Sequence, residues 1–186
     1  MIKRLGLLLV FSLITMGGCQ SVPDSFSPMP PKVDGQDVVQ VPVLDVVDGD
    51  TIKVQFQDQV VKIRFLLIDT PETHHPKLGI QPFGPEASSE THRLLDHQNV
   101  ILEFAQNRGK DKYGRYLAYV FTQKQSVEID LLEKGLARVA YVIPPNTKYL
   151  KEYQLAEAGA KKAHRGVWKT PGYAKQDGFH PEVLGN

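Results

Sequence analysis

The chain of 186 residues is predicted to fold as an α+β protein, with a small closed β-barrel and helices packed beside it. Two observations support this prediction. Apolar and polar side chains alternate through much of the first half, as in half-buried strands, whereas the second half shows helical spacing. The content of hydrophobic residues, 41%, and of charged residues, 23%, is typical of a globular domain.

The first 18 residues are predicted to be an export signal. Lys3 and Arg4 precede an uncharged apolar run from Leu5 to Met16, which is too short to span a bilayer comfortably. Small residues then lead to Cys19, the only cysteine, so no intrachain disulfide can form. The segment resembles a bacterial lipoprotein signal, in which Cys19 would be lipidated and anchor the protein to a bacterial membrane. An ordinary secretory signal is the alternative, and both would export the protein.

Residues 19–40 are expected to form a flexible tether, and residues 41–168 the folded domain. The tether is rich in Pro, Ser, Asp and Gln, a composition that cannot build a core. Trp168 is expected to be the last anchor of the domain, followed by an irregular tail, residues 169–186. The formal net charge of the chain is +1, so affinity for a polyanion would have to come from local basic clusters or from a bound cation.

Strands are predicted early in the domain. Ile52, Val54 and Phe56 alternate with polar residues, the period of a half-buried strand, and the alternation resumes after a polar turn at residues 57–59. At least four strands are expected, in residues 52–56, 61–65, 100–105 and 116–121.

Three helices are predicted beside these strands. Pro85 is suited to the first turn of one helix, and Ser126 can cap another. Asn146 or Thr147 would cap the third. Apolar side chains at helical spacing give each a face that can pack on the barrel. The helices are expected to end near Gln98, Gly135 and Gly166.

Several aspartates lie at positions where a turn or a strand end is expected. Asp48 and Asp50 flank Gly49, and Asp69 directly follows a strongly apolar run, where a carboxylate is costly unless it has a partner. Taken singly, these segments are common turn sequences. Two or more aspartates with a backbone carbonyl and water would suit Ca²⁺, whereas no cluster of His or Cys favours zinc.

Two arginines accompany the aspartates. Arg64 shares a strand face with Leu66 and Ile68, and Arg115 closes a glycine-containing loop that a solvated basic turn would also explain. Two guanidinium groups converging on one phosphate could bind it bidentately and offset the charge that grows on its oxygens. Simple alternation places Arg64 and Asp69 on opposite faces of one strand, so only a bulge or a sharp bend between them would bring them together.

The order and spacing of these motifs resemble those of the staphylococcal nuclease, or thermonuclease, family. The resemblance covers residues 43–168, nearly the whole expected domain. It implies a five-stranded OB-fold barrel with three helices, and calcium-dependent hydrolysis of DNA and RNA that leaves 3′-phosphates. The matching segments are VDGDT at 47–51, RFLLIDTPET at 64–73, GPEA at 84–87, DKYGR at 111–115, GLA at 135–137 and AYV at 140–142.

The resemblance implies a role for each matching residue. Asp50 and Asp69 would bind Ca²⁺ together with the backbone carbonyl of Thr70, and Asp48 would be an acid close to that metal. The residues expected to act on the phosphate and on the attacking water are Arg64 and Arg115, as clamps, and Glu72, which would orient the water and could deprotonate it.

Lys112, Tyr113 and Tyr141 match residues that line the nucleotide pocket of the family. Two positions depart from the best-known member: Leu78 stands in place of a loop lysine, and Ile143 in place of a second pocket tyrosine. Substrate affinity and nucleotide preference therefore stay open. We predict a monomeric nuclease; the alternatives are a barrel that binds nucleic acid without cutting it and a structural surface lipoprotein.

Overall fold

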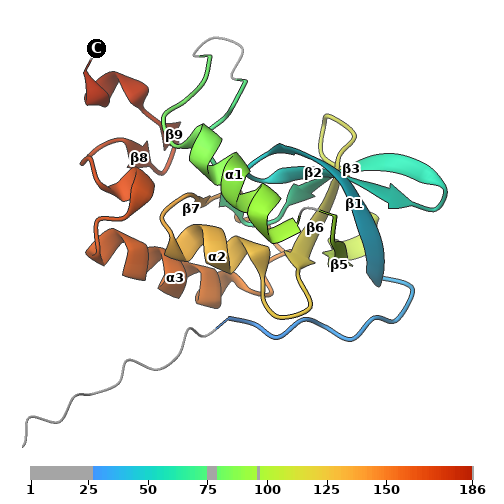
Figure 1. The fold of residues 1–186 in the computed structure, drawn as a ribbon. Coiled ribbons are helices and arrows are strands. Elements are labelled where there is room, and N and C mark those ends of the chain that lie inside the picture. The colour runs from blue at the N-terminus through green and yellow to red at the C-terminus, as the bar shows by residue number, and fades with distance from the viewer. Residues whose placement is uncertain (1–26, 75–78, 96, 186) are drawn as a thin grey trace, which may run out of the picture.

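The computed structural model describes residues 27–74, 79–95 and 97–185. Within these residues five strands close into a barrel in the order β1-β2-β3-β6-β5, with three α-helices to one side (Figure 1). This confirms the predicted α+β OB-fold. Antiparallel pairing of β1 with β5 closes the cylinder, and β3 runs parallel to β6. The strands are β1 (Val38–Asp48), β2 (Thr51–Phe56), β3 (Gln59–Phe65), β5 (Asn99–Phe104) and β6 (Tyr116–Phe121).

The barrel strands form where the sequence alternates. Ile52 and Val54 of β2 and Ile63 of β3 are fully buried, and each such side chain contributes roughly 1.5–3 kcal/mol through the apolar surface it removes from water. β1 begins three residues earlier than the expected domain start at residue 41, because Val38 and Val39 already pair with β5.

The helices pack against one another and against the barrel. α1 (Gly84–Leu95) contacts β1, and α2 (Val127–Glu133) packs along α3 (Leu150–Lys162). The Ser126 hydroxyl accepts a hydrogen bond from the Ile129 amide at 3.3 Å, so the predicted cap of α2 is confirmed. α1 ends at Leu95, earlier than the expected end near Gln98.

The expected cap of α3 is wrong. The helix begins at Leu150, after Tyr149, and no side chain caps it. The Asn146 side chain instead accepts a hydrogen bond from the backbone of Gln106, at 2.9 Å. The Asn146 side chain, which was expected to cap α3, therefore binds a residue that is distant in sequence.

The C-terminal tail is ordered rather than irregular. It forms a short hairpin of β8 (Ala174–Lys175) and β9 (Gly178–Phe179), followed by a 3₁₀ turn at Pro181–Leu184. Tyr173 is fully buried whereas Trp168 is only partly so, so Trp168 is not the last anchor.

A second small sheet lies beside the barrel. β4 (Ile68–Asp69) pairs antiparallel with β7 (Arg138–Val139), in the register Ile68 with Val139 and Asp69 with Arg138. This pairing places the segment that follows β3 against the segment that follows α2.

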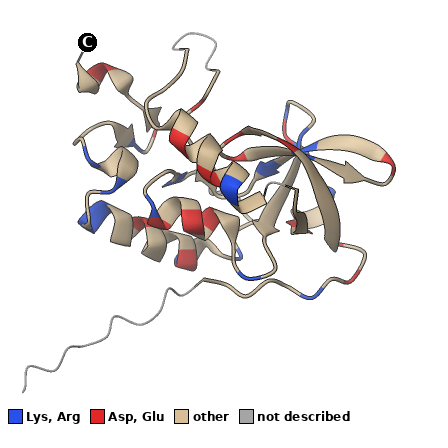
Figure 2. Ribbon diagram, viewed as in Figure 1, with Lys and Arg blue, Asp and Glu red and all other residues tan. Residues whose placement is uncertain are grey.

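Acidic and basic residues both occur across the described part of the chain (Figure 2), although single elements can carry one sign: the charged residues of α2 are all acidic, and those of β3 are both basic. None of the helices described is long and apolar enough to cross a membrane. The predicted export signal, Cys19 and Leu78 lie outside the described residues.

Candidate active site

Two aspartates share one buried arginine where the β1–β2 turn meets the end of β3. Arg64 Nε lies 3.0 Å from Asp50 Oδ1, and Arg64 Nη2 lies 3.2 Å from Asp69 Oδ1. All three side chains are buried. Such charges are tolerated inside a protein only when they are paired and hydrogen-bonded, as they are here. The structure thus joins residues from two of the matching segments, 47–51 and 64–73.

A sharp bend brings Arg64 and Asp69 to the same side. Leu67, between β3 and β4, has φ +63°, a left-handed conformation that is uncommon for a bulky residue. The bend turns two carbonyls toward the guanidinium, and Arg64 Nη1 donates to the carbonyl oxygens of Phe65 and Ile68, both at 2.8 Å. The bend that the sequence required but did not reveal is therefore present.

Asp50 holds the neighbouring chain segment in place. Its Oδ2 accepts hydrogen bonds from the Thr70 amide at 2.9 Å and from the Thr70 hydroxyl at 3.1 Å, while its Oδ1 accepts from the Thr51 hydroxyl at 3.1 Å. The Asp48 carboxylate in turn accepts from the Asp50 amide at 3.1 Å. Asp50 is thus linked to Asp48 and to Thr70 by hydrogen bonds, and to Asp69 through the shared Arg64.

Gly49 allows this turn to approach α1 closely. A Cβ atom at this position would lie 2.7 Å from both Ala87 Cβ and Thr70 Oγ1, closer than atoms normally approach. The Gly49 carbonyl also accepts a 2.7 Å hydrogen bond from the buried Thr91 hydroxyl. A glycine is needed here because of contacts with other segments, in addition to the turn itself.

The matching segment at residues 111–115 supplies Arg115. Arg115 Nε lies 2.7 Å from Asp111 Oδ2, and the other oxygen of Asp111 accepts from the Tyr113 and Arg115 amides at 2.9 and 3.0 Å. Arg115 Nη1 reaches the Thr51 hydroxyl at 3.3 Å. Thr51 thus bridges Arg115 to Asp50, so both arginines lie within one polar network.

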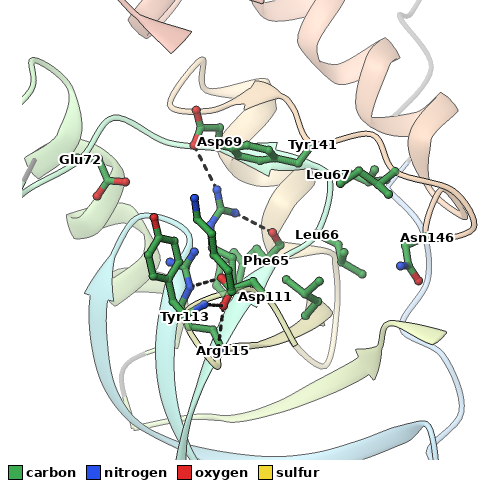
Figure 3. A pocket seen from close by; sticks show the side chains of 14 residues that line it. Phe65, Leu66, Leu67, Asp69, Glu72, Asp111, Tyr113, Arg115, Tyr141 and Asn146 are labelled. Carbon is green, nitrogen blue, oxygen red and sulfur yellow. Dashed lines mark hydrogen bonds and ion pairs between the residues drawn. The ribbon is translucent and has the colours of Figure 1, made fainter. Parts of the chain in front are cut away.

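These groups open into a cavity of about 570 Å³. In Figure 3, Tyr141 lies beside Asp69, Tyr113 lies beside Arg115 and Asp111, and Glu72 stands apart on another part of the rim. The cavity is large enough for a nucleotide-sized group. Its lining includes Arg64, Asp69, Glu72, Lys112, Tyr113, Arg115, Tyr141 and Ile143.

The residues expected to contact a nucleotide lie at the mouth of this cavity. Tyr113, Tyr141 and Ile143 are all exposed. The Arg64 guanidinium lies 5.4 Å from the centre of the Tyr141 ring, and Lys112 Nζ lies 5.0 Å from that of Tyr113. Lys112 therefore borders the cavity through its contact with Tyr113.

Three acids at the cavity, Asp48, Asp69 and Glu72, have raised pKa values. Burial raises the pKa of Asp48 to about 7, with further contributions from Asp50 and Glu72. Burial and then the negative charge of Asp50 raise the pKa of Asp69 and of Glu72, against the opposing effect of Arg64. Burial is the largest cause for all three acids, and repulsion between neighbouring carboxylates adds to it.

This donor set fits a hard divalent cation. Carboxylate oxygens are the ligands that Ca²⁺ prefers, and a cation would relieve the repulsion that adds to the effect of burial on these pKa values. Among the described residues no three acidic, His or Cys side chains enclose a metal site by themselves. Asp50 and Asp69 would therefore need the Thr70 carbonyl and water to complete the coordination of an ion.

Sequence reasoning missed three residues of this network. Arg138 pairs with Asp69, at 2.7 Å from Nη2 to Oδ2; Thr51 bridges Asp50 and Arg115; and Gln81 binds the backbone of Glu72 on both sides. Arg138 interrupts the apolar run 136–140 directly after a matching motif, which is the one sequence signal that could have indicated it.

Comparison with known proteins identifies relatives over most of the chain. The sequence model of a family described as "Staphylococcal nuclease homologue" matches residues 62–170. The chain is 44% identical over 145 residues to the SPbeta prophage-derived endonuclease YokF of Bacillus subtilis (strain 168), covering 78% of this chain and 49% of that protein. It is 43% identical over 143 residues to the endonuclease YncB of the same strain, covering 77% and 68%.

A third relative comes from another genus. The chain is 40% identical over 128 residues to the thermonuclease of Staphylococcus hyicus, covering 69% of this chain and 75% of that one. Against YokF, by contrast, the chain spans only about half of the relative's length. The family match includes Arg64, Asp69, Glu72 and Arg115 and begins after Asp50.

Proposed function

This chain belongs to the staphylococcal nuclease family, and from that premise we propose that it is a calcium-dependent nuclease that hydrolyses phosphodiester bonds of DNA and RNA and leaves 3′-phosphates. The observation that carries the proposal is the meeting of two aspartates, two arginines and one glutamate around a single cavity. The relatives include proteins named endonucleases and a thermonuclease, which supports the same reaction class.

Arg64 and Arg115 are the proposed phosphate clamps. Both guanidinium groups line the cavity, and Thr51 connects the network of one to that of the other. A guanidinium can donate two parallel hydrogen bonds to a phosphate and stays charged at every physiological pH. Held in place by Asp50, Asp69 and Asp111, the two groups would stabilise the charge that develops on the phosphate oxygens as the bond breaks.

Glu72 is proposed to orient the attacking water. Its backbone is held by Gln81, whose side chain accepts from the Glu72 amide at 2.8 Å and whose amide donates to the Glu72 carbonyl at 2.9 Å. Burial, Asp50 and Asp69 raise the pKa of Glu72. A raised pKa makes the carboxylate a better base, so proton abstraction can accompany the alignment of the water.

Asp50, Asp69 and the Thr70 carbonyl are the proposed holders of Ca²⁺. The bound ion would supply positive charge beside the phosphate and lower the pKa of a bound water. Asp48 would keep Asp50 in orientation through the hydrogen bond from the Asp50 amide. Thr70 fixes Asp50 from the other side, so the donor oxygens are held before a cation arrives.

Tyr113, Tyr141 and Lys112 are the proposed contacts of the nucleotide. The two exposed rings can stack on bases. Stacking depends little on base identity, because every base has an aromatic face, and this suits a nuclease that acts on both DNA and RNA. Ile143 lines the same cavity without an aromatic ring. We therefore propose weaker stacking at that position than a tyrosine would give.

The decisive experiment incubates the purified protein with plasmid DNA and with RNA, in calcium or in EGTA. Cleavage that EGTA abolishes, with ends that resist a 3′-end-extending polymerase until a phosphatase has acted, supports the proposal. A Glu72→Gln variant is the matched control: it should retain binding and lose cleavage. Binding without cleavage by the unaltered protein would indicate a barrel that binds nucleic acid without cutting it. If the protein neither binds nor cleaves nucleic acid, a structural surface lipoprotein is the alternative that stays.

We further propose that the protein acts outside the cell as a monomer, anchored to a bacterial membrane through lipid on Cys19. The export and the anchor are proposed from the sequence of the first 19 residues alone. Incorporation of labelled palmitate that a Cys19→Ser substitution abolishes would support it. Release of unlabelled protein into the medium would instead indicate an ordinary secretory signal.

A further inference from the structure

The C-terminal hairpin is packed into the domain by an aromatic cluster. Tyr173 is fully buried, and its ring centre lies 5.6 Å from that of Phe83 and 5.8 Å from that of Phe179. The amide of His180 donates to the Tyr173 carbonyl at 2.7 Å and so joins the ends of the hairpin. These contacts tie residues 173–180 to the segment just before α1, about 90 residues earlier in the chain.

One connection runs from this hairpin to Asp69. The Gln176 carbonyl accepts a 2.9 Å hydrogen bond from Arg138 Nη1, and the Phe179 ring lies 5.5 Å from the Arg138 guanidinium. The same guanidinium donates to Asp69 Oδ2 from Nη2 at 2.7 Å and from Nε at 3.1 Å. Because the guanidinium is planar and rigid, an anchor on one edge fixes the direction of the other.

A second connection runs to Glu72. The Tyr173 hydroxyl donates to the Pro82 carbonyl, and the Tyr173 ring packs on Phe83. The neighbouring residue, Gln81, is the one that holds the Glu72 backbone through two hydrogen bonds. The hairpin therefore grips the segment that holds Glu72, independently of its contact with Arg138.

We propose that residues 173–180 are a positioning element of the active site, which sets the orientation of Asp69 through Arg138 and the placement of Glu72 through Pro82 and Phe83. Arg138 and Tyr173 are positioning residues: Arg138 contacts the proposed metal ligand Asp69, and Tyr173 contacts the segment next to Gln81, which holds the Glu72 backbone. The assignment of roles to Asp69 and Glu72 rests on the proposed function, but the contacts themselves do not.

A hairpin that served only as a stabilising cap would behave differently. Loosening a cap would lower the free energy of unfolding and leave the folded site unchanged. Loosening a positioning element weakens metal binding and turnover in protein that is still folded. Residues that orient metal ligands from behind typically change metal affinity or activity by about 10- to 100-fold when they are altered.

The test uses two conservative variants of the full chain. Arg138→Lys keeps the charge but cannot reach both Asp69 and the Gln176 carbonyl, and Tyr173→Phe removes only the hydroxyl. The matched controls are Arg165→Lys, which alters an arginine bound to the Glu133 carbonyl, and Tyr149→Phe, which removes a hydroxyl bound to Glu103. Calcium affinity by calorimetry, kcat and KM separately, and amide hydrogen exchange at Thr70 and Glu72 are measured for all four.

Arg138→Lys should weaken calcium binding and lower kcat by about 10-fold or more, and it should speed exchange at Thr70. Tyr173→Phe should lower kcat with little change in calcium affinity, and it should speed exchange at Glu72. The controls should change none of these. Variants that match their controls in all three measurements would overturn the proposal.

Failure of the proposed function would look different. If the unaltered protein cleaves neither DNA nor RNA, the nuclease assignment is lost, and hydrogen exchange at Thr70 and Glu72 still decides whether the hairpin orders these two positions. If the unaltered protein cleaves and the variants are indistinguishable from the controls, the nuclease assignment stands and the positioning element is rejected.

Discussion

Two clusters of buried acid in this molecule are built from different partners. Around the cavity, Asp50 and Asp69 meet guanidinium groups, with Arg64 between them and Arg138 behind Asp69. In the core, the fully buried Glu128 meets neutral donors: the Val120 amide at 2.8 Å and the Ser126 hydroxyl at 2.8 Å, with the Tyr153 hydroxyl 3.3 Å from that of Ser126.

Burial of an acid therefore does not by itself mark a functional site. Burial raises the pKa of Glu128 to about 7, although its hydrogen bonds oppose this. The pKa of Asp69 is also raised by burial and by Asp50, yet two arginines stand ready to balance its charge. What distinguishes the cavity is that both carboxylate and guanidinium groups lie next to an opening, where a cation and a phosphate could enter. The Glu128 cluster is closed, and its role is to hold α2 on β6.

The largest effect is expected at the open cluster, from Arg115→Lys. Lysine keeps the charge but cannot reproduce the fork that holds Asp111 and Thr51 and would bind a phosphate. We expect kcat for DNA cleavage to fall by about 10²–10³-fold, the usual effect of losing one donor to a transition state, with little change in thermal stability. Arg93→Lys, on the exposed face of α1, is the control. Near-normal turnover in Arg115→Lys would reject the clamp assignment.

An intermediate effect is expected at the closed cluster, from Glu128→Gln. Because the pKa of Glu128 is about 7 in the folded protein and 4.5 is its ordinary value, the folded state binds the proton more tightly. Its stabilising contribution is complete below pH 4.5 and is lost as pH rises toward and through 7, by about 3 kcal/mol in total. The glutamine variant should lack this loss.

The measurement is the free energy of unfolding from urea titrations between pH 4.5 and 8.5, as the difference between the unaltered protein and Glu128→Gln. Taking the difference cancels the raised pKa values of the acids around the cavity, Asp48 among them. A difference that does not change with pH would contradict the prediction. Nuclease activity at a fixed pH should be the same in both proteins.

The smallest effect is expected from Tyr153→Phe, also in the closed cluster. The substitution removes a hydroxyl that lies 3.3 Å from that of Ser126 and keeps the fully buried ring. A neutral hydrogen bond typically contributes about 1 kcal/mol, so the free energy of unfolding should fall by about that amount. Loss of cleavage activity in this variant would contradict the independence of the two clusters and show that they are coupled.

Much of the fold could be predicted from the sequence because short-range rules decide it. The alternation at residues 52–56 places Ile52 and Val54 in the core whatever lies beside them, and Ser126 caps α2 through a contact three residues away. Asn146 misled the same reasoning because its side chain binds Gln106, 40 residues earlier. Local rules fail where a distant partner competes for the same group.

The residues of the site also fall into those that the sequence indicated and those that it did not. The sequence indicated which residue types carry the chemistry, and the structure brings Arg64, Asp69, Arg115 and Glu72 to one cavity, with Asp50 paired to Arg64. The sequence did not indicate Arg138 or Gln81, because their importance lies in contacts with Asp69 and Glu72 that no local pattern encodes. The hairpin around Tyr173 was missed for the same reason, since its burial depends on Phe83.

The side-chain period and each residue's own functional group account for the main barrel strands, the three helices and the groups available for chemistry. How those groups meet depends on the tertiary fold. The left-handed turn at Leu67 puts Arg64 and Asp69 on one side, and the pairing of β4 with β7 brings Arg138 behind Asp69. The C-terminal hairpin then contacts Arg138 through the Gln176 carbonyl. Each of these depends on packing between segments far apart in the chain, where many weak contacts together select one arrangement.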